Sequence, residues 1–123
     1  MPFEIRESSE LLYVRFFGVV SNEDLQRQGM EIERLEARIG RPINRFIDMI
    51  DVDTIDAGYS EVWRYVSRRL ALKYSGPFKC AFIAPRPMLF GYARMFQMLN
   101  DNPQLEIRIF DTIEEARRWF NAG

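Results

Sequence analysis

The order in which strand-like and helix-like stretches follow one another is the feature that most constrains this fold. Two short apolar runs typical of strands open the chain, and segments with helical spacing of apolar residues then alternate with further strand-like runs. The predicted strands cover residues 3–7, 11–20, 45–50, 78–85 and 105–110, and the predicted helices cover 21–40, 59–70, 86–103 and 112–120. Because strands that alternate with helices build parallel sheets, this order predicts an α/β domain.

The predicted sheet is mixed, mostly parallel and five-stranded. The turn-forming stretch 8–10 predicts an antiparallel hairpin of the first two strands, and later strands join through right-handed crossovers. Sequential crossovers of one hand place the helices on one side, so we expect four helices mainly on one face. Charged residues inside the strands agree, because a sheet covered on both faces would read as nearly continuous Val, Ile and Leu. They are Arg15, Asp48, Lys79, Glu106 and Arg108.

Several residues mark the ends of the predicted helices. Ser21 stands where a helix cap belongs, with Asp24 as its capping-box partner, and Gly40 ends the same helix. Asp111 or Thr112 is expected to cap the final helix. These signals agree with the apolar periodicity.

Length and composition exclude several classes of protein. The 123 residues predict a single domain over 1–123 with its own hydrophobic core. The net charge of -1 gives no general attraction to nucleic acid or to an acidic membrane surface. Histidine is absent, which removes Ser-His and Cys-His nucleophile pairs and histidine metal sites. Any catalysis would rest on carboxylates, and we expect no cofactor and no resident metal.

The single cysteine and the hydropathy pattern bear on location. Cys80 falls inside an apolar run, which favours a buried, unreactive thiol and excludes a disulfide framework. No stretch approaches the roughly 20 consecutive apolar residues of a membrane span, and the acidic first ten residues do not look like a signal peptide. We therefore expect a cytoplasmic protein without membrane insertion.

One motif suggests an enzyme. Asp51-Val52-Asp53-Thr54 spells the DxDxT of haloacid-dehalogenase-like phosphatases, in which the first aspartate attacks phosphorus, the second acts as acid and base, and later acidic residues complete a Mg²⁺ site. After Asp56 the remaining aspartates are Asp101 and Asp111, and neither sits in an acidic pair after a strand. The simpler interpretation is a strand end, with Asp56 as the cap of the next helix.

The sequence resembles a known fold family over nearly its whole length. The stretches that carry the resemblance are "NRFIDMIDVDTIDAG", "KCAFIAP", "FGYARMFQML" and "LEIRIFDTIEEARRWF". Together they look like the SpoIIAA-like branch of the STAS fold, which is related to sulfate transporter and anti-sigma-factor antagonist domains. This branch is also similar to CRAL-TRIO lipid-binding domains. The resemblance implies a fold more firmly than an activity.

The resemblance also implies where a regulatory switch would lie. Phosphorylatable antagonists of this fold carry Asp-Ser-Ser-Gly at the start of the second main helix, next to a partner-binding surface. The comparable residues here are Asp56-Ala57-Gly58-Tyr59, so Ala57 stands where the acceptor serine would be. Ser60 and Thr54 are nearby but would need a shifted recognition geometry. A partner or ligand role without the standard switch is the better expectation.

The third predicted helix supplies the main binding candidates. Residues 88–99 are apolar at most positions, which is too many for one buried stripe of a surface helix. The helix is either buried nearly all round or forms a dimer interface or a wall of a pocket for an apolar ligand. Tyr59 and Trp63 on the preceding helix face the same choice. The candidate binding residues are Asp56, Tyr59, Trp63, Phe90, Tyr92, Arg94, Met95 and Phe96.

These observations predict a non-catalytic STAS-like binding or regulatory module that contacts a protein partner or a second copy, with a homodimer expected. Two alternatives stay open: a carrier of a lipid or other apolar small molecule, and a Mg²⁺-dependent phosphohydrolase using Asp51 and Asp53. Arg64, Arg68 and Arg69 form a small basic patch without a nucleic-acid motif, so we interpret it as a solvated helix face and expect no nucleic-acid partner.

Overall fold

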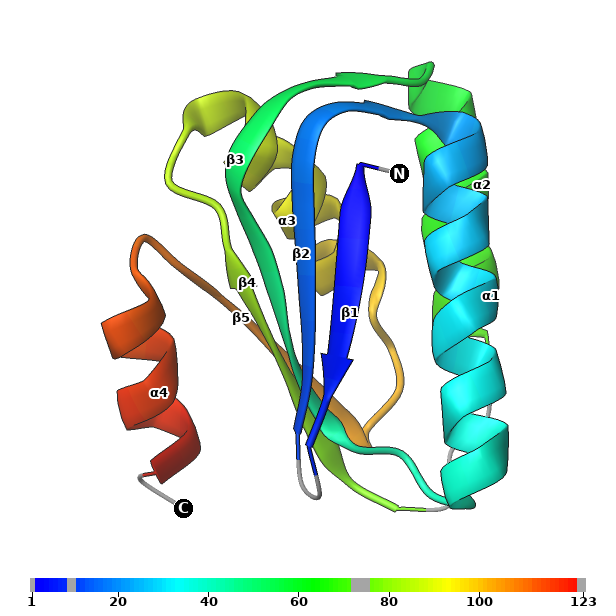
Figure 1. Cartoon of the computed structure of the whole chain (residues 1–123), viewed down its shortest axis with the longest axis vertical. Helices are drawn as coiled ribbons and strands as arrows, with labels where there is room; N and C mark the ends of the chain where they lie inside the picture. The colour runs from blue at the N-terminus through cyan, green and yellow to red at the C-terminus, as the bar shows by residue number, and fades with distance from the viewer. Residues whose placement is uncertain (1, 9–10, 72–75, 122–123) are drawn as a thin grey trace.

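The computed structural model describes residues 2–8, 11–71 and 76–121, and it has the predicted order of elements (Figure 1). Every predicted strand and helix is present within those residues. The strands are β1 (Phe3–Glu7), β2 (Leu11–Ser21), β3 (Asn44–Asp56), β4 (Phe78–Ile83) and β5 (Leu105–Phe110). The helices are α1 (Asn22–Ile39), α2 (Tyr59–Leu70), α3 (Pro87–Leu99) and α4 (Ile113–Asn121).

The sheet has the predicted mixed, mostly parallel topology. Its strands lie in the order β1-β2-β3-β4-β5, with β1 antiparallel to β2 and the other neighbours parallel. The predicted turn at 8–10 lies partly outside the described residues, but the pairing of β1 with β2 confirms the hairpin. The strand order equals the sequence order, so each crossover joins adjacent strands.

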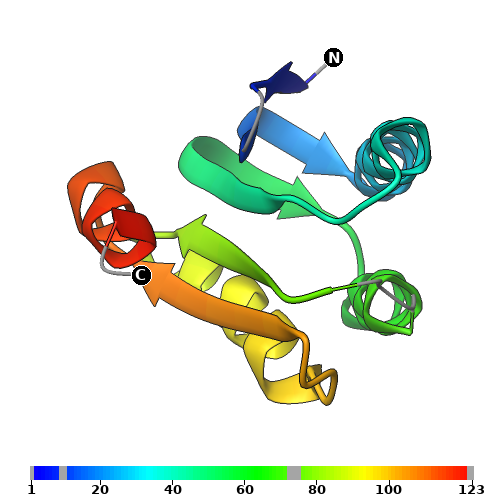
Figure 2. The same cartoon turned by 90° about the horizontal axis from the view of Figure 1, so that it is seen from below.

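Three helices cover one face of the sheet, and the fourth helix covers part of the other. The larger core lies under α1, α2 and α3, which contribute Ile32, Val66 and Leu89 to it. On the opposite face, Ala116 and Trp119 of α4 pack against a smaller core that includes Phe46 (Figure 2). The prediction of helices mainly on one face is confirmed. Within the described residues α4 does not connect two strands, so the crossover rule does not fix the side on which it packs.

The face that α4 leaves partly uncovered carries the charged strand residues, as predicted. Arg15 of β2 pairs with Asp51 at 2.8 Å, and the Tyr13 hydroxyl donates a hydrogen bond to Asp48 of β3. Lys79 and Arg108 lie with their charged groups 5.1 Å from the centre of the Trp119 ring. Polar pairing and cation–π contacts thus satisfy groups that a fully covered sheet would have to desolvate.

The caps of α1 and α4 follow the sequence signals. Ser21 and Asp24 form a capping box, in which the Ser21 Oγ accepts from the Asp24 backbone N–H at 3.2 Å. Gly40 ends α1 with a φ of 84°, which a residue with a Cβ adopts only with strain. Thr112 caps α4, because its Oγ1 accepts from the Glu115 backbone N–H at 3.3 Å.

The prediction that Asp56 caps α2 is wrong. Strand β3 continues to Asp56, which pairs with Ser21 of β2, so this residue belongs to the sheet. Gly58 is the N-cap of α2, and the Glu61 carboxylate accepts from its backbone N–H at 2.9 Å. The strand runs past the predicted end at residue 50 because β2 extends far enough to pair with it.

Candidate functional site

The DxDxT stretch lies along β3 and is already engaged with its surroundings. The Asp51 carboxylate accepts from the Arg15 guanidinium at 2.8 Å, and Asp53 and Thr54 are exposed strand residues. Among the described residues, no group of three or more His, Cys, Asp or Glu side chains is arranged to hold a metal ion. The motif therefore has the geometry of a strand in which the Asp51 carboxylate is ion-paired.

Helix α3 divides its apolar side chains between the core and the surface. Leu89 and Ala93 are buried, and Tyr92, Met95 and Phe96 are half-buried and pack against the larger core. The remaining apolar side chains are exposed, and these are Met88, Phe90, Met98 and Leu99. One part of this helix therefore belongs to the core, and another part is exposed and available for binding.

Phe96 belongs to the core side of that division. Its ring centroid lies 5.1 Å from that of Phe82 in β4 and 5.9 Å from that of Tyr65 in α2. Such aromatic pairs add to the stabilisation that burial gives. A charged residue at this position would unfold the chain locally, so Phe96 is a poor probe of a surface contact.

One flank of α2 contacts α1, and this fixes where its exposed aromatic residues lie. Arg68 and Tyr65 reach Glu33 and Gln28 of α1. Tyr59 lies about half a turn around the helix from Arg68, since each residue advances about 100°. Tyr59 and Trp63, which are 72% and 44% exposed, therefore occupy the flank away from α1, which faces α3.

The flank of α3 that faces α2 carries matching apolar side chains. The opposite flank of α3 faces β5, because the side-chain amide of Gln97 on that flank donates to the Ile107 carbonyl of β5 at 3.0 Å. Met88 and Leu99 lie about half a turn from Gln97 and are 42% and 37% exposed. We call Tyr59, Trp63, Met88 and Leu99 the α2–α3 surface.

The other predicted site residues lie elsewhere. Phe90 and Arg94 share the β5 side of α3 with Gln97, and the Arg94 guanidinium donates to the Gln97 side chain. Asp56 is exposed at the end of β3, shortly before α2 begins. The eight predicted residues thus divide among the α2–α3 surface, the core, the opposite flank of α3 and, for Asp56, the end of β3.

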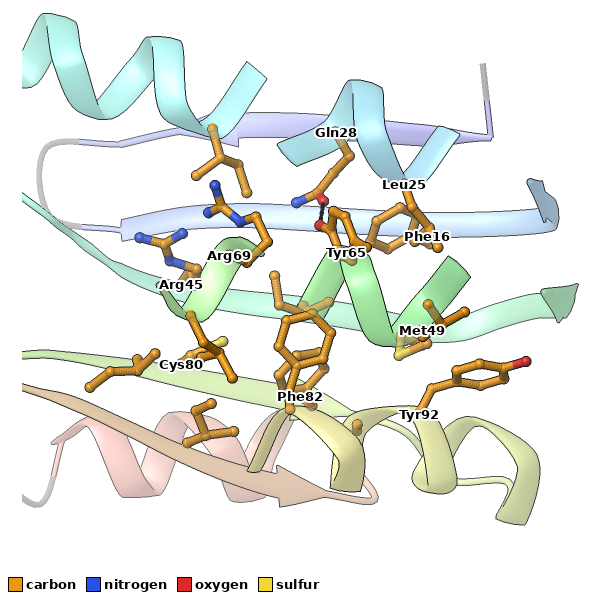
Figure 3. A pocket seen from close by; sticks show the side chains of 18 of the residues that line it. Phe16, Leu25, Gln28, Arg45, Met49, Tyr65, Arg69, Cys80, Phe82 and Tyr92 are labelled. Atoms are coloured by element: carbon orange, nitrogen blue, oxygen red, sulfur yellow. Dashed lines mark hydrogen bonds between the residues drawn. The ribbon is translucent and has the colours of Figure 1, made fainter. Parts of the chain in front are cut away.

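A cavity of about 80 Å³, partly open to solvent, lies between the sheet and helices α1, α2 and α3. Figure 3 shows Arg45 and Arg69 at one end of it and Met49 and Tyr92 at the other. Between the two ends the wall is mostly aliphatic and aromatic, and it includes Phe82. The cavity is thus basic at one end and apolar along the rest of its length.

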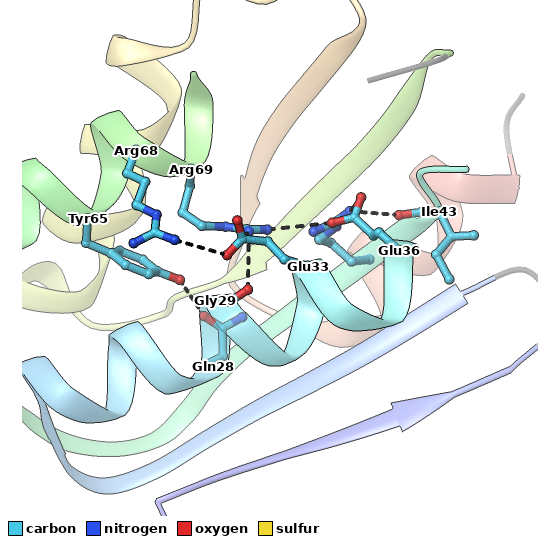
Figure 4. Close-up of polar contacts among 9 residues, drawn as sticks. Gln28, Gly29, Glu33, Glu36, Ile43, Tyr65, Arg68 and Arg69 are labelled. Carbon is cyan, nitrogen blue, oxygen red and sulfur yellow. Dashed lines mark hydrogen bonds and ion pairs between the residues drawn. The ribbon is translucent and has the colours of Figure 1, made fainter. Parts of the chain in front are cut away.

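A buried ionic network forms the basic end of the cavity (Figure 4). Glu36 of α1 accepts from the Arg45 Nη2 at 3.1 Å, and its other carboxylate oxygen lies 3.8 Å from the Arg69 Nη2. Arg69 also lies 3.8 Å from Glu33. The side chains of Arg45 and Glu36 are 5% and 11% exposed, so this pair is shielded from solvent. Arg69, predicted to be part of a solvated face, is buried instead.

A glycine lets α1 and α2 approach closely beside this network. A Cβ added at Gly29 would lie 3.1 Å from a ring carbon of Tyr65 and 3.3 Å from the Arg69 Cδ. The Tyr65 hydroxyl donates to the Gln28 side chain, and the Arg69 Nη1 donates to the Gly29 carbonyl at 3.3 Å. The network therefore depends on a small residue in the middle of α1.

Cys80 is buried as predicted, and burial raises the pKa of its thiol to about 12. At pH 8 this lowers the thiolate fraction roughly 2,000-fold relative to an ordinary cysteine with a pKa of about 8.5. We expect an aromatic disulfide reagent to label Cys80 at pH 8 only after urea unfolds the chain. The fold favours the neutral thiol. The free energy of unfolding should therefore fall as the pH rises from the ordinary cysteine pKa of about 8.5 toward 12. Equal labelling rates with and without urea would contradict this assignment.

Within the part of the chain that the structure describes, no helix is both long and apolar enough to cross a membrane. No family model matches the sequence, and no curated protein matches it. The structural comparisons carry more information, because they cover nearly the whole chain.

Three solved structures have a similar fold. One is an uncharacterized protein of the DUF3478 family with a SpoIIAA-like fold from Shewanella loihica PV-4, which is 18% identical, has a TM-score of 0.62, and matches over 95% of this chain and 90% of that one. The anti-sigma factor antagonist SpoIIAA in its unphosphorylated form is 16% identical, with a TM-score of 0.61 and 98% of both chains covered. The Bacillus cell fate determinant SpoIIAA in its phosphorylated form is 18% identical, with a TM-score of 0.55 over 96% of this chain and 98% of that one.

Likeness at this level of identity concerns the arrangement of the backbone and carries no activity across. Each of the three structures matches 95% or more of this chain, with a TM-score of 0.55 or higher. The chain therefore has a SpoIIAA-like fold, the STAS-type architecture that its sequence predicted.

Proposed function

We propose that this chain is a non-catalytic binding module that engages a protein partner through the α2–α3 surface. The observation that carries the proposal is the exposure of Tyr59 and Trp63 on the flank of α2 away from α1, together with that of Met88 and Leu99 on the flank of α3 opposite Gln97. Single exposed apolar residues are ordinary, but large side chains that gather on neighbouring helices are typical of interaction sites. Tryptophan and tyrosine are also enriched among the residues that dominate binding energies.

The position of this surface in the fold supports the same proposal. Tyr59, Trp63 and Met88 lie in the first turns of α2 and α3, which begin directly after the carboxyl ends of β3 and β4, whereas Leu99 is the last residue of α3. The carboxyl edge of an open α/β sheet is where ligands commonly bind. Ile55 and Tyr92, which are half-buried near this edge, continue the apolar character toward the interior. A partner bound here would contact the loops that precede α2 and α3 and the first turns of both helices.

The fold neighbours support a regulatory protein contact. One of them is described as an anti-sigma factor antagonist, which is a protein that acts against another protein. That protein also exists in a phosphorylated form, whereas Ala57 stands where this chain would need the acceptor serine. We therefore propose partner engagement that does not depend on that phosphorylation switch.

The two alternative functions have weaker support. A phosphohydrolase would need Asp51 free to attack phosphorus, and Asp51 pairs with Arg15. A lipid carrier would need room for a long chain, and a cavity of about 80 Å³ is near half of the roughly 150 Å³ that holds benzene in an engineered protein. The CRAL-TRIO relation, the homodimer and the cytoplasmic location stay predictions from the sequence.

Changing Trp63 to serine is expected to weaken partner binding at least tenfold, because loss of a central anchor commonly costs about 2 kcal/mol or more. The matched control is Met30→Ser, since Met30 is 52% exposed on the outer face of α1, away from the α2–α3 surface. The measurement is quantitative mass spectrometry of proteins that copurify with each tagged variant from the source cell. Equal loss for both variants, or no loss for Trp63→Ser, would contradict the proposal.

A further inference from the structure

Among the described residues, one buried side-chain nitrogen of the cavity wall has no hydrogen-bond partner. The Arg45 Nε is buried and lacks a hydrogen-bond acceptor among the residues that the structure describes. The other end of the same guanidinium is well placed, because its Nη2 donates to Glu36 at 3.1 Å and to the Ile43 carbonyl at 3.4 Å. A buried donor without an acceptor is costly, so native proteins satisfy nearly all of them. Something outside the described residues is therefore expected to accept from this atom.

The charges around Arg45 favour an anionic acceptor. Arg45 and Arg69 line this end of the cavity, and no carboxylate side chain is among the lining residues, because Glu33 and Glu36 pair with these arginines from outside the lining. The cavity wall is therefore basic at this end, although Glu33 and Glu36 balance the formal charge of the two arginines. A carboxylate placed beside this wall would accept a charge-assisted hydrogen bond from the Arg45 Nε, and such a bond is stronger than one to a neutral acceptor.

The rest of the cavity is suited to an alkyl group. Arg45, Ile47 and Met49 alternate along β3, so their side chains lie on one face over roughly 13 Å. Phe82 of β4 and Ile107 of β5 continue the same apolar wall. Cys80 adds no charge to this wall, because burial raises the pKa of its thiol to about 12.

We propose that this cavity binds a small apolar monocarboxylate, whose carboxylate accepts from the Arg45 Nε and whose short alkyl chain lies along Ile47 and Phe82. The cavity volume of about 80 Å³ limits the enclosed part of the ligand to a few non-hydrogen atoms. This inference does not rest on the proposed partner contact, which uses the outer side of α2 and α3. A short acid is thus the expected occupant, in place of a lipid.

The competing occupant is water. A buried water would also accept from the Arg45 Nε, and polar cavities of sufficient size commonly hold one. Water would leave the apolar wall without a favourable contact, whereas each methylene buried there raises affinity about fourfold. Dependence on both the carboxylate and the alkyl length therefore distinguishes the two occupants.

The test is NMR observation of the arginine Nε–H groups in the full chain, with the Arg45 signal assigned through its own backbone. Acetate, propanoate, butanoate and hexanoate are titrated at pH 6.5. We expect the Arg45 Nε–H resonance to shift, with affinity rising about fourfold per added methylene until the cavity is filled. Because the wild-type chain is observed, the result does not depend on whether a variant folds.

Matched compounds and variants decide the interpretation. 1-Butanol, which lacks the carboxylate, should leave the Arg45 signal in place, and Arg45→Lys should reduce butanoate affinity at least tenfold, by analogy with truncation of a buried charged contact. Arg94→Lys, which changes an exposed arginine on α3, should bind butanoate as the wild type does. An unmoved Arg45 signal, an equal response to 1-butanol, or affinity independent of chain length would overturn the proposal and leave water as the occupant.

Discussion

Replacing Glu36 by alanine is expected to lower the free energy of unfolding by about 3–5 kcal/mol. Glu36 is the acceptor for Arg45 at 3.1 Å and lies 3.8 Å from Arg69, and both arginines are buried. Removing the carboxylate leaves two desolvated guanidiniums with too few acceptors. The loss would be a large part of the total stability of a domain of this size, which is about 5–15 kcal/mol.

Glu31→Ala is the matched control on the same helix. Glu31 pairs with Arg34 at 2.8 Å, but both side chains are exposed, so the change should stay within about 0.5 kcal/mol. Urea unfolding followed by circular dichroism gives both values. Similar losses in the two variants would mean that the buried network does not stabilise the fold as its geometry indicates.

The second large effect is expected at Phe46, where alanine should cost about 3–5 kcal/mol. The Phe46 ring lies 4.8 Å from that of Phe120 and 6.4 Å from that of Tyr13, measured between centroids. It also packs with Trp119 in the smaller core that attaches α4 to the sheet. Removing it leaves a cavity under α4 that the surrounding strands cannot fill.

Phe90→Ala is the matched control for this substitution. Phe90 is an exposed residue of α3, so the same change should alter stability by about 0.5 kcal/mol or less. Near-ultraviolet circular dichroism should report loss of tryptophan asymmetry in Phe46→Ala but not in Phe90→Ala. A stable Phe46→Ala variant with an unchanged spectrum would show that α4 is attached by other contacts.

The sequence predicted the fold well because local and global signals agree. The spacing of apolar residues, the capping residues and the turn residues all mark the same helix boundaries, as at Ser21, Gly40 and Thr112. The prediction that Asp56 caps α2 was wrong for a physical reason. Strand length depends on the pairing partner, and the sequence alone does not reveal that β2 and β3 remain paired as far as Ser21 and Asp56.

The candidate site was predictable only in part. The excess of apolar residues in α3 left open whether they are buried or exposed, because the exposure of each one depends on the positions of α2 and β5. The buried network was missed, although Gln28 and Glu36 accompany the apolar stripe of Leu25, Ile32 and Leu35. Polar residues beside such a stripe signal a buried contact only when their partners on other elements are known, and these lie far away in the sequence.

The most direct test of the proposed function is site-specific photocrosslinking in the source cell. A photoreactive phenylalanine analogue is placed at position 63 in one variant and at position 30 in another, since both side chains are exposed. The proposal expects a discrete covalent adduct with a protein from position 63 and none from position 30. An adduct of twice the monomer mass would identify a second copy as the partner. Absence of an adduct at position 63, or the same adducts from both positions, would contradict the assignment of the α2–α3 surface as the binding site.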